Sequence, residues 1–421
     1  MTEPSSPTAS GPAPADPAAP LPGLLAGVTV LDLSTVGPAA RCTRLLADYG
    51  ATVVKVGAVP GRGPQPITPP FYAYSGSRWL QRIAINLKDP DGHEAFMALA
   101  RKADVVVESF RPGVVDRLGI GYAALTEANP GIILCSTTGF GQSGPRADWV
   151  GHDINYLAVG GYLASSQPRA DGGPPIAGAT LADAAGGGMQ AAMAIMAVLI
   201  GRRRTGVGAH LDVSIADGVL WLTSLAVDEH LATGAEVGPG TNILSGRFAC
   251  YDTYRAADGK WLAVGAIEPK FFANLCERLG LKQWVSHQLD DEVQDKIRAE
   301  FGAAFAARDR DEWVEELVGF ETCVSPVQSV AELVDDEQYR ARGAVVDVVM
   351  DGVDGPRAEG MGDIEGPLRF RQVGPVLAGM VRPDGVVRAP YPEASETDSL
   401  LEAAGIPPER IAELRTRGVV A

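Results

Sequence analysis

The chain has 421 residues, 46% of them hydrophobic, and its 36 Lys and Arg against 52 Asp and Glu give a net charge of −16. This length and composition exclude the disordered and disulfide-scaffold classes and favour a globular protein of two domains. The negative charge argues against nucleic-acid and membrane partners, because its field repels polyphosphate. Any anionic ligand must therefore meet a local basic patch.

Strands alternate with helices through the first third of the chain. Apolar runs predict strands at 28–33, 51–56, 83–87, 104–108 and 131–137, with helices at 39–49 and 89–101. This alternation predicts a Rossmann-like, doubly wound parallel sheet, and we assign it to a large α/β domain over residues 23–214. The preceding 1–22 are mostly Ala, Pro, Ser and Thr, without a signal-peptide core, and predict a disordered tail.

The pattern changes in the second half of the chain. An apolar helix is expected at 183–199, ended by Gly201 and followed by a helical linker over 215–244. Its longest apolar run, 189–200, is too short to span a bilayer. A hairpin at 249–254 and 261–266, with helices at 271–279 and 290–307, predicts a small α+β domain over 245–335. The remaining 336–421, with a helix at 397–404, predict a segment that returns to the large domain.

Two sequence features argue against common cofactors. Residues 139–144 match the G-x-G-x-x-G fingerprint of dinucleotide sites, but Pro145 follows at once where a helix should open, so we predict a turn. The five cysteines lie far apart, with no C-x-x-C pair and no Cys/His cluster at zinc spacing. We therefore expect no metal, no disulfide framework and a cytoplasmic location.

Three residues stand out as candidates for chemistry. His152, in a loop where a helix could begin with Asp153 as N-cap, is a potential base near neutral pH, although it could also serve only loop hydrogen bonds. Asp183 opens the apolar helix, either as an ordinary N-cap or as a functional carboxylate. Three glycines at 186–188 follow it, as expected where a ligand or another backbone approaches closely. Glu268, taken alone, is an ordinary solvated carboxylate at the end of a strand.

The segments around these residues carry a family resemblance. GHDINY at 151–156, LADAAGGG at 181–188 and YDTYRAADGKWLAVGAIEP at 251–269 resemble α-methylacyl-CoA racemase, within the class III CoA-transferase superfamily. The resemblance covers about residues 24 to 345. It implies that His152 and Asp183 are the two acid/base groups and that Glu268 orients the histidine. It also implies an acyl-CoA substrate, no cofactor and an interlocked homodimer.

The same resemblance implies a CoA site that includes a local basic patch. The positions implied are Ile85, Asn86, Leu87, Lys88, Ser109, Phe110, Arg111, Arg117, Gly151, Asp153, Ile154, Asn155 and Tyr156. Two segments depart from the family pattern. Residues 56–60 lack the arginine of a V-D-R-P stretch, which Arg62 could replace, and 245–249 lack a Gly-Gly-Ala-Pro run that bears on acyl specificity.

Two reactions fit these residues, and so does CoA-ester binding without catalysis. A racemase or epimerase would invert the α-carbon of a 2-methylacyl-CoA thioester by 1,1-proton transfer through an enolate, with His152 and Asp183 on opposite faces. A class III CoA-transferase would instead form an aspartyl-acyl anhydride at Asp183. A CoA-ester binder without activity is the third alternative. The acyl group stays open among branched fatty, sterol side-chain and arylpropionyl groups.

Overall fold

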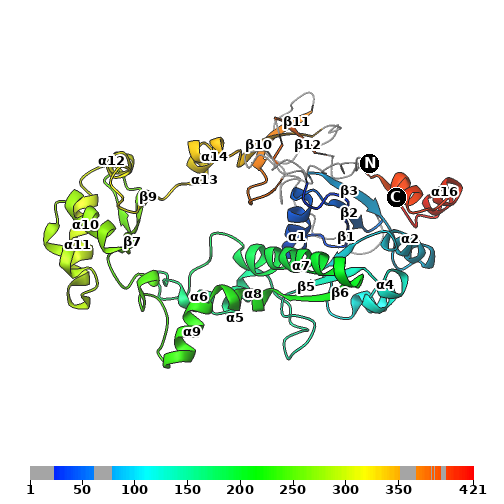
Figure 1. The fold of residues 1–421 in the computed structure, drawn as a ribbon, viewed down its shortest axis with the longest axis horizontal. Coiled ribbons are helices and arrows are strands. Elements are labelled where there is room, and N and C mark those ends of the chain that lie inside the picture. The colour runs from blue at the N-terminus through cyan, green and yellow to red at the C-terminus, as the bar shows by residue number, and fades with distance from the viewer. Residues whose placement is uncertain (1–22, 61–77, 351–366, 381, 384, 390–394) are drawn as a thin grey trace, which may run out of the picture.

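The computed structural model describes residues 23–60, 78–350, 367–380, 382–383, 385–389 and 395–421 (Figure 1). The predicted tail at 1–22 and Arg62 lie outside the described residues. Two separate bodies are visible in Figure 1: a large one built on a parallel sheet, and a smaller one set apart from it.

The large body is built on six parallel strands in the order β3-β2-β1-β4-β5-β6. Their bounds are β1 Thr29–Asp32, β2 Thr52–Gly57, β3 Leu80–Ala84, β4 Val105–Glu108, β5 Ile133–Thr138 and β6 Ala209–Ser214. The predicted doubly wound parallel sheet is confirmed. Its order reverses between β1 and β4, and ligands of such sheets bind beyond the carboxyl ends of the strands at that switch point.

Helices cover both faces of this sheet, because alternate strand residues point to opposite sides. Val30 and its neighbours in register pack under α1 (Gly37–Asp48) and α7 (Gln190–Thr205). Leu31 and its neighbours pack on the other face. That face is covered by α2 Pro90–Ala100, α3 Val114–Arg117 and α4 Tyr122–Ala128.

The apolar helix is longer than the sequence predicted. It opens as a π-helix, Ala182–Met189, continues as α7, and ends where Gly206 adopts a left-handed φ of 69°. Gly201 does not end it, since this residue keeps a helical backbone. By length and composition alone the whole helix, Ala182–Thr205, would suffice to cross a membrane. Its buried residues pack on the sheet, on α1 and on α8 (Ile215–Leu222), as in a core helix.

Other helices join the large body to the small one. Helices α5 (Asp153–Val159) and α6 (Tyr162–Ser165) lie beside α8, which is followed by α9 (Ser224–Thr233). The helical linker expected at 215–244 therefore contains two helices. They break at Thr223, whose hydroxyl donates to the Gly160 carbonyl oxygen at 2.9 Å.

The small body has an antiparallel sheet in the order β7-β8-β9 and a core of its own. Its elements are β7 Tyr251–Arg255, β8 Trp261–Gly265, α10 Pro269–Arg278, α11 Gln294–Phe305, α12 Arg310–Leu317 and β9 Val324–Pro326. The chain leaves it through α13 (Val330–Leu333) and α14 (Glu337–Ala341), which Figure 1 shows on the way back to the large body.

The last segment packs on the large body. It forms the sheet β11-β10-β12 and two helices: β10 Val345–Met350, β11 Leu368–Val373, β12 Val387–Ala389, α15 Thr397–Ala403 and α16 Pro408–Thr416. Leu401 and Leu414 join the core under α2, and Val420 bridges to Ile85. The third strand was expected at 83–87. It ends at Ala84, because the C-terminal residues cover the sheet edge from Ile85 onward.

Candidate active site

A pocket of about 370 Å³ lies at the carboxyl ends of β1, β4, β5 and β6, next to the switch point of the sheet. It brings together residues that are far apart in sequence, including His152, Asp183 and Arg111. The lining residues are Val36, Gly37, Pro38, Ser109, Phe110, Arg111, Pro112, Thr137, Thr138, Gly139, Ala147, Trp149, Val150, Gly151, His152, Tyr156, Asp183 and Ile215.

His152 is presented to the pocket by the start of α5. It occupies the N-cap position itself, with extended backbone, and its N–H donates to the Asn155 side chain at 3.0 Å. Asp153, predicted as the N-cap, is instead the first helical residue. The imidazole is exposed, so it can exchange protons with a bound substrate and with water.

Asp183 lies in the first turn of the π-helix, two residues beyond the N-cap position, which Leu181 holds. Its N–H donates to the Asp153 carboxylate at 2.9 Å. Burial, and then the negative charge of Asp153, raise the pKa of the Asp183 carboxyl, while Arg41 and His152 oppose the shift. A carboxyl group tuned upward in this way suits an acid/base role better than an ordinary surface aspartate.

The three glycines after Asp183 serve helix packing rather than ligand approach. A Cβ at Gly186 would lie 3.0 Å from the Ile215 carbonyl oxygen of the α8 turn, and one at Gly187 would lie 2.5 Å from the Pro38 side chain of α1. The sequence left open whether a ligand or another backbone approaches these glycines, and the structure shows that another backbone does. The alternative expectation, that a ligand approaches these glycines, is wrong at Gly186 and Gly187, because α8 and α1 occupy that space.

Aromatic side chains form one wall of the pocket. The Tyr156 hydroxyl donates to the Gly151 carbonyl oxygen at 2.6 Å, and burial raises the pKa of Tyr156 to about 12. Phe140 packs edge-on against both Tyr156 and Trp149. Phe140 belongs to the 139–144 segment, which forms the predicted turn, because the next helix begins only at Asp153. Trp149, three residues before His152, also lines the pocket, although no sequence pattern indicated it.

The three predicted basic residues do not gather at one point. Arg111 is exposed and is the one cation among the described residues lining this pocket. Arg117 is exposed at the end of α3, outside the lining. Lys88 is exposed beyond β3, three strands from β4, which at a strand spacing of about 4.8 Å is roughly 14 Å along the sheet edge.

The other predicted CoA positions fall into two groups. Ser109, Phe110, Gly151 and Tyr156 line the pocket. Ile85 and Leu87 turn their side chains into the core, and the Asn86 N–H is already donated to Val419, so these three offer little to a ligand. The residues in the first turn of α5, outside the lining, are Asp153, Ile154 and Asn155.

Glu268 does not meet His152 within one chain. It is exposed and immediately precedes α10 in the small body, and Figure 1 shows α10 well away from α5. Its charge acts within the small body, where burial and then the negative charge of Glu268 raise the pKa of the Cys323 thiol. The expected orienting contact is therefore not formed within the single chain, because β8 carries Glu268 to the other body.

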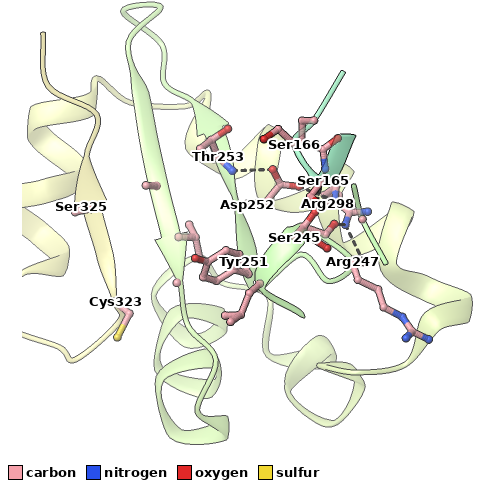
Figure 2. Close-up of a pocket in the computed structure, with 17 residues that line it drawn as sticks. Ser165, Ser166, Ser245, Arg247, Tyr251, Asp252, Thr253, Arg298, Cys323 and Ser325 are labelled. Carbon is pink, nitrogen blue, oxygen red and sulfur yellow. Dashed lines mark hydrogen bonds and ion pairs between the residues drawn. The ribbon is translucent and has the colours of Figure 1, made fainter. Parts of the chain in front are cut away.

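A larger cavity of about 1170 Å³ lies between the end of α6 and the small sheet (Figure 2). Its arginines are already neutralised, since Arg298 pairs with Asp252 at 2.8 Å and Arg247 with Asp291 at 2.6 Å. It contains none of the residues predicted for catalysis or CoA binding, although Ser245, Gly246 and Arg247 of the 245–249 segment line it. The described residues also include no group of three or more His, Cys, Asp or Glu side chains placed to hold a metal. We therefore take the smaller pocket as the candidate active site.

A doubly wound sheet with a histidine and an aspartate in one pocket at its switch point defines an α/β enzyme of the acid/base or acyl-transfer type. The chain belongs to CoA-transferase family III, whose family model matches residues 25–372. Human alpha-methylacyl-CoA racemase is 35% identical over 323 residues, covering 76% of this chain and 82% of that protein. The acetyl-CoA:oxalate CoA-transferase of Acetobacter aceti is 32% identical over 354 residues, covering 79% and 87%.

Solved structures agree with the fold. The crystal structure of Rv3272 from M. tuberculosis superposes with a TM-score of 0.71 at 24% identity, covering 89% of this chain and 97% of that chain. A CaiB/BaiF family protein from Brucella suis superposes with a TM-score of 0.65 at 24% identity, covering 95% and 100%. At these identities the structures establish the fold alone.

Proposed function

We propose that this chain is a racemase or epimerase of 2-methylacyl-CoA thioesters. The observation that carries the proposal is the presence of His152 and Asp183 in one pocket at the switch point of the sheet. Inverting a carbon next to a thioester needs one group to remove the α-proton and another to deliver a proton to the opposite face. A histidine and an aspartate with a raised pKa can exchange these roles, each acting as base in one direction.

The intermediate of this reaction is an enolate, whose oxygen needs hydrogen-bond donors. The N–H groups of Asp153 and Ile154, the first two of α5, follow His152 directly and have no acceptors within the helix. Together with the positive end of the helix dipole, they can stabilise negative charge at the edge of the pocket. Arg111, in the same pocket, would meet a phosphate of CoA.

CoA transfer is the second candidate function, and similarity to named CoA-transferases supports it. In that reaction the Asp183 carboxylate attacks the thioester carbonyl, and CoA leaves as a thiolate. The acceptor carboxylate then attacks the Asp183 carbonyl of the anhydride and releases the donor acid. The CoA thiolate finally attacks the acceptor carbonyl and frees the Asp183 carboxylate. Such a nucleophile must be ionised and needs no second proton carrier. The raised pKa of Asp183 and the position of His152 in the same pocket favour proton transfer.

Incubation of one epimer of a 2-methylacyl-CoA in deuterated water, without an acceptor acid, separates the two reactions. A racemase incorporates deuterium at the α-carbon while the two epimers equilibrate. A transferase leaves the α-carbon untouched until a free carboxylic acid is added, and CoA then moves to that acid. Absence of α-exchange together with acid-dependent transfer refutes the racemase proposal.

We further propose that the active enzyme is a homodimer in which Glu268 of a second copy reaches His152. Glu268 is exposed and lies apart from the pocket of its own chain. The helices near the pocket also expose large apolar side chains: Met193, Ile200, Trp221, Leu225 and Leu231 are 57 to 75% exposed, and α9 has no buried residue. An apolar surface of this extent is typical of an interface.

Mixing two inactive variants tests the shared site. His152→Ala and Glu268→Ala chains, unfolded and refolded together, should form heterodimers in half of all dimers, with one intact site of two in each. About a quarter of the parental activity should return, whereas either variant alone stays low. No recovery, with sedimentation showing dimers, would mean that each site is built within one chain.

A cytoplasmic location and the lack of nucleic-acid and membrane partners stay predictions from the sequence.

A further inference from the structure

Glu108 is a buried carboxyl group that the proposed reaction does not use. It is the last residue of β4, and its exposed fraction is 2%. Within the described part of the chain no cation forms an ion pair with it, and burial raises the pKa of Glu108. A buried carboxyl without a counter-ion is costly unless hydrogen bonds compensate for the lost water.

Those hydrogen bonds lead directly to the pocket. The Phe110 N–H donates to a Glu108 carboxylate oxygen at 2.6 Å. Phe110 belongs to the segment 109–112. All four residues of this segment line the pocket that contains His152 and Asp183. The carboxylate thus fixes the backbone of the segment that also carries Arg111.

A second set of contacts holds Glu108 from behind. Ser136 is its partner in register on β5, and this side chain opposes the rise in the pKa of Glu108. The Ser136 hydroxyl also contacts the His210 ring nitrogen Nε2 at 2.9 Å. The ring of His210, on β6, stacks on Tyr122 of α4, with centroids 5.7 Å apart. Ser136 therefore lies between Glu108, its neighbour on β4, and His210 on β6, behind the strand end that leads into the pocket segment.

We propose that Glu108 is a positioning residue, which holds the pocket segment 109–112 in its ligand-binding conformation through the Phe110 N–H, with Ser136 and His210 as its support. Hydrogen bonds between a carboxylate and a backbone N–H are stronger than those between neutral groups. The bond from the Phe110 N–H to Glu108 therefore restrains the segment that follows the end of β4. The inference rests on the proposed CoA site, since its consequence is the geometry of Arg111.

Substitution separates positioning from general stability. Glu108→Ala removes the acceptor and should raise KM for the acyl-CoA about 10-fold while kcat changes less than about threefold, because remote CoA contacts are similar in ground and transition states. Glu108→Gln keeps an acceptor for Phe110 and should bring KM back to within about threefold of the parent. Asp212→Ala is the matched control: its carboxylate holds the Gln142 N–H at 3.0 Å, outside the pocket lining, and KM should stay at the parental value.

Hydrogen exchange decides the matter even if Glu108→Ala does not fold. The Phe110 amide should exchange slowly in the parent and in Glu108→Gln, and fast in Glu108→Ala. A Phe110 amide that exchanges in the parent as fast as an exposed loop amide overturns the proposal, and so does parental KM in a folded Glu108→Ala. Because exchange is measured without ligand, failure of the parent to bind CoA would tell against the CoA site and leave the test of Glu108 intact.

Discussion

Gly218 lies where α8 crosses the π-helix that carries Asp183, and its replacement by alanine should damage both stability and activity. A Cβ at this position would lie 2.0 Å from the Gly186 carbonyl oxygen and 2.5 Å from the Gly186 carbonyl carbon. Favourable contact between such atoms needs about 3.5 Å, so roughly 1.5 Å of overlap must be relieved. Both partners are backbone, so the two helices have to move apart.

The cost of this overlap follows from its size. Overpacking by one methyl group costs about 1–3 kcal/mol when side chains can yield, and we expect the upper end here because no side chain can. For a body of this size each kcal/mol lowers Tm by about 2–4 °C, so a fall of roughly 6–12 °C is expected. Asp183 lies three residues before Gly186, and a displacement of about 1 Å at a catalytic group can cost 10²-fold in turnover.

Gly201→Ala is the matched control. Gly201 lies inside α7 and nothing stands within 4 Å of an added Cβ, so alanine should stabilise the helix by about 1 kcal/mol and leave turnover unchanged. Thermal unfolding by calorimetry and α-deuterium exchange would be measured on both variants. Parental Tm and turnover in Gly218→Ala would refute the packing argument, and so would equal losses in the two variants.

Three further changes test the site itself. His152→Ala and Asp183→Ala should each lower turnover by roughly 10²-fold or more while the chain stays folded, and near-parental turnover in either variant removes that residue from the mechanism. Asp153→Asn keeps an acceptor for the Asp183 N–H but removes a like charge, so the pKa of Asp183 should fall. The epimer whose α-proton Asp183 removes needs ionised Asp183, so the acidic limb of its pH–rate profile should move to lower pH. The opposite epimer needs protonated Asp183, so the basic limb of its profile should move to lower pH. If neither limb moves, the assignment of Asp183 is wrong. Arg111→Ala should raise KM about 10-fold with kcat nearly unchanged, and added salt should weaken binding of the parent more than of the variant; equal KM values at low salt would mean that CoA lies elsewhere.

The sequence by itself determined the parallel sheet and the main candidates for catalysis. Each buried strand is a short apolar run separated from the next by a helix, and this alternation is a local property of the chain that dictates a doubly wound sheet. His152 and Asp183 could be selected from their residue types, from their settings at predicted helix starts and from the family resemblance. The end of β3 could not be predicted, because the residue that pairs with Ile85 is Val420, more than 300 positions away.

Only the tertiary structure decided which groups meet. The glycines after Asp183 are required by α1 and α8, which no local pattern indicates, and Glu268 lies away from His152 because the small body is set apart from the sheet. The bond from Phe110 to Glu108 is local, yet its importance depends on the burial of Glu108 by distant elements. Periodicity in a sequence records which face of an element is apolar. The partner of that face, and the polar groups enclosed with it, are fixed only when the elements pack.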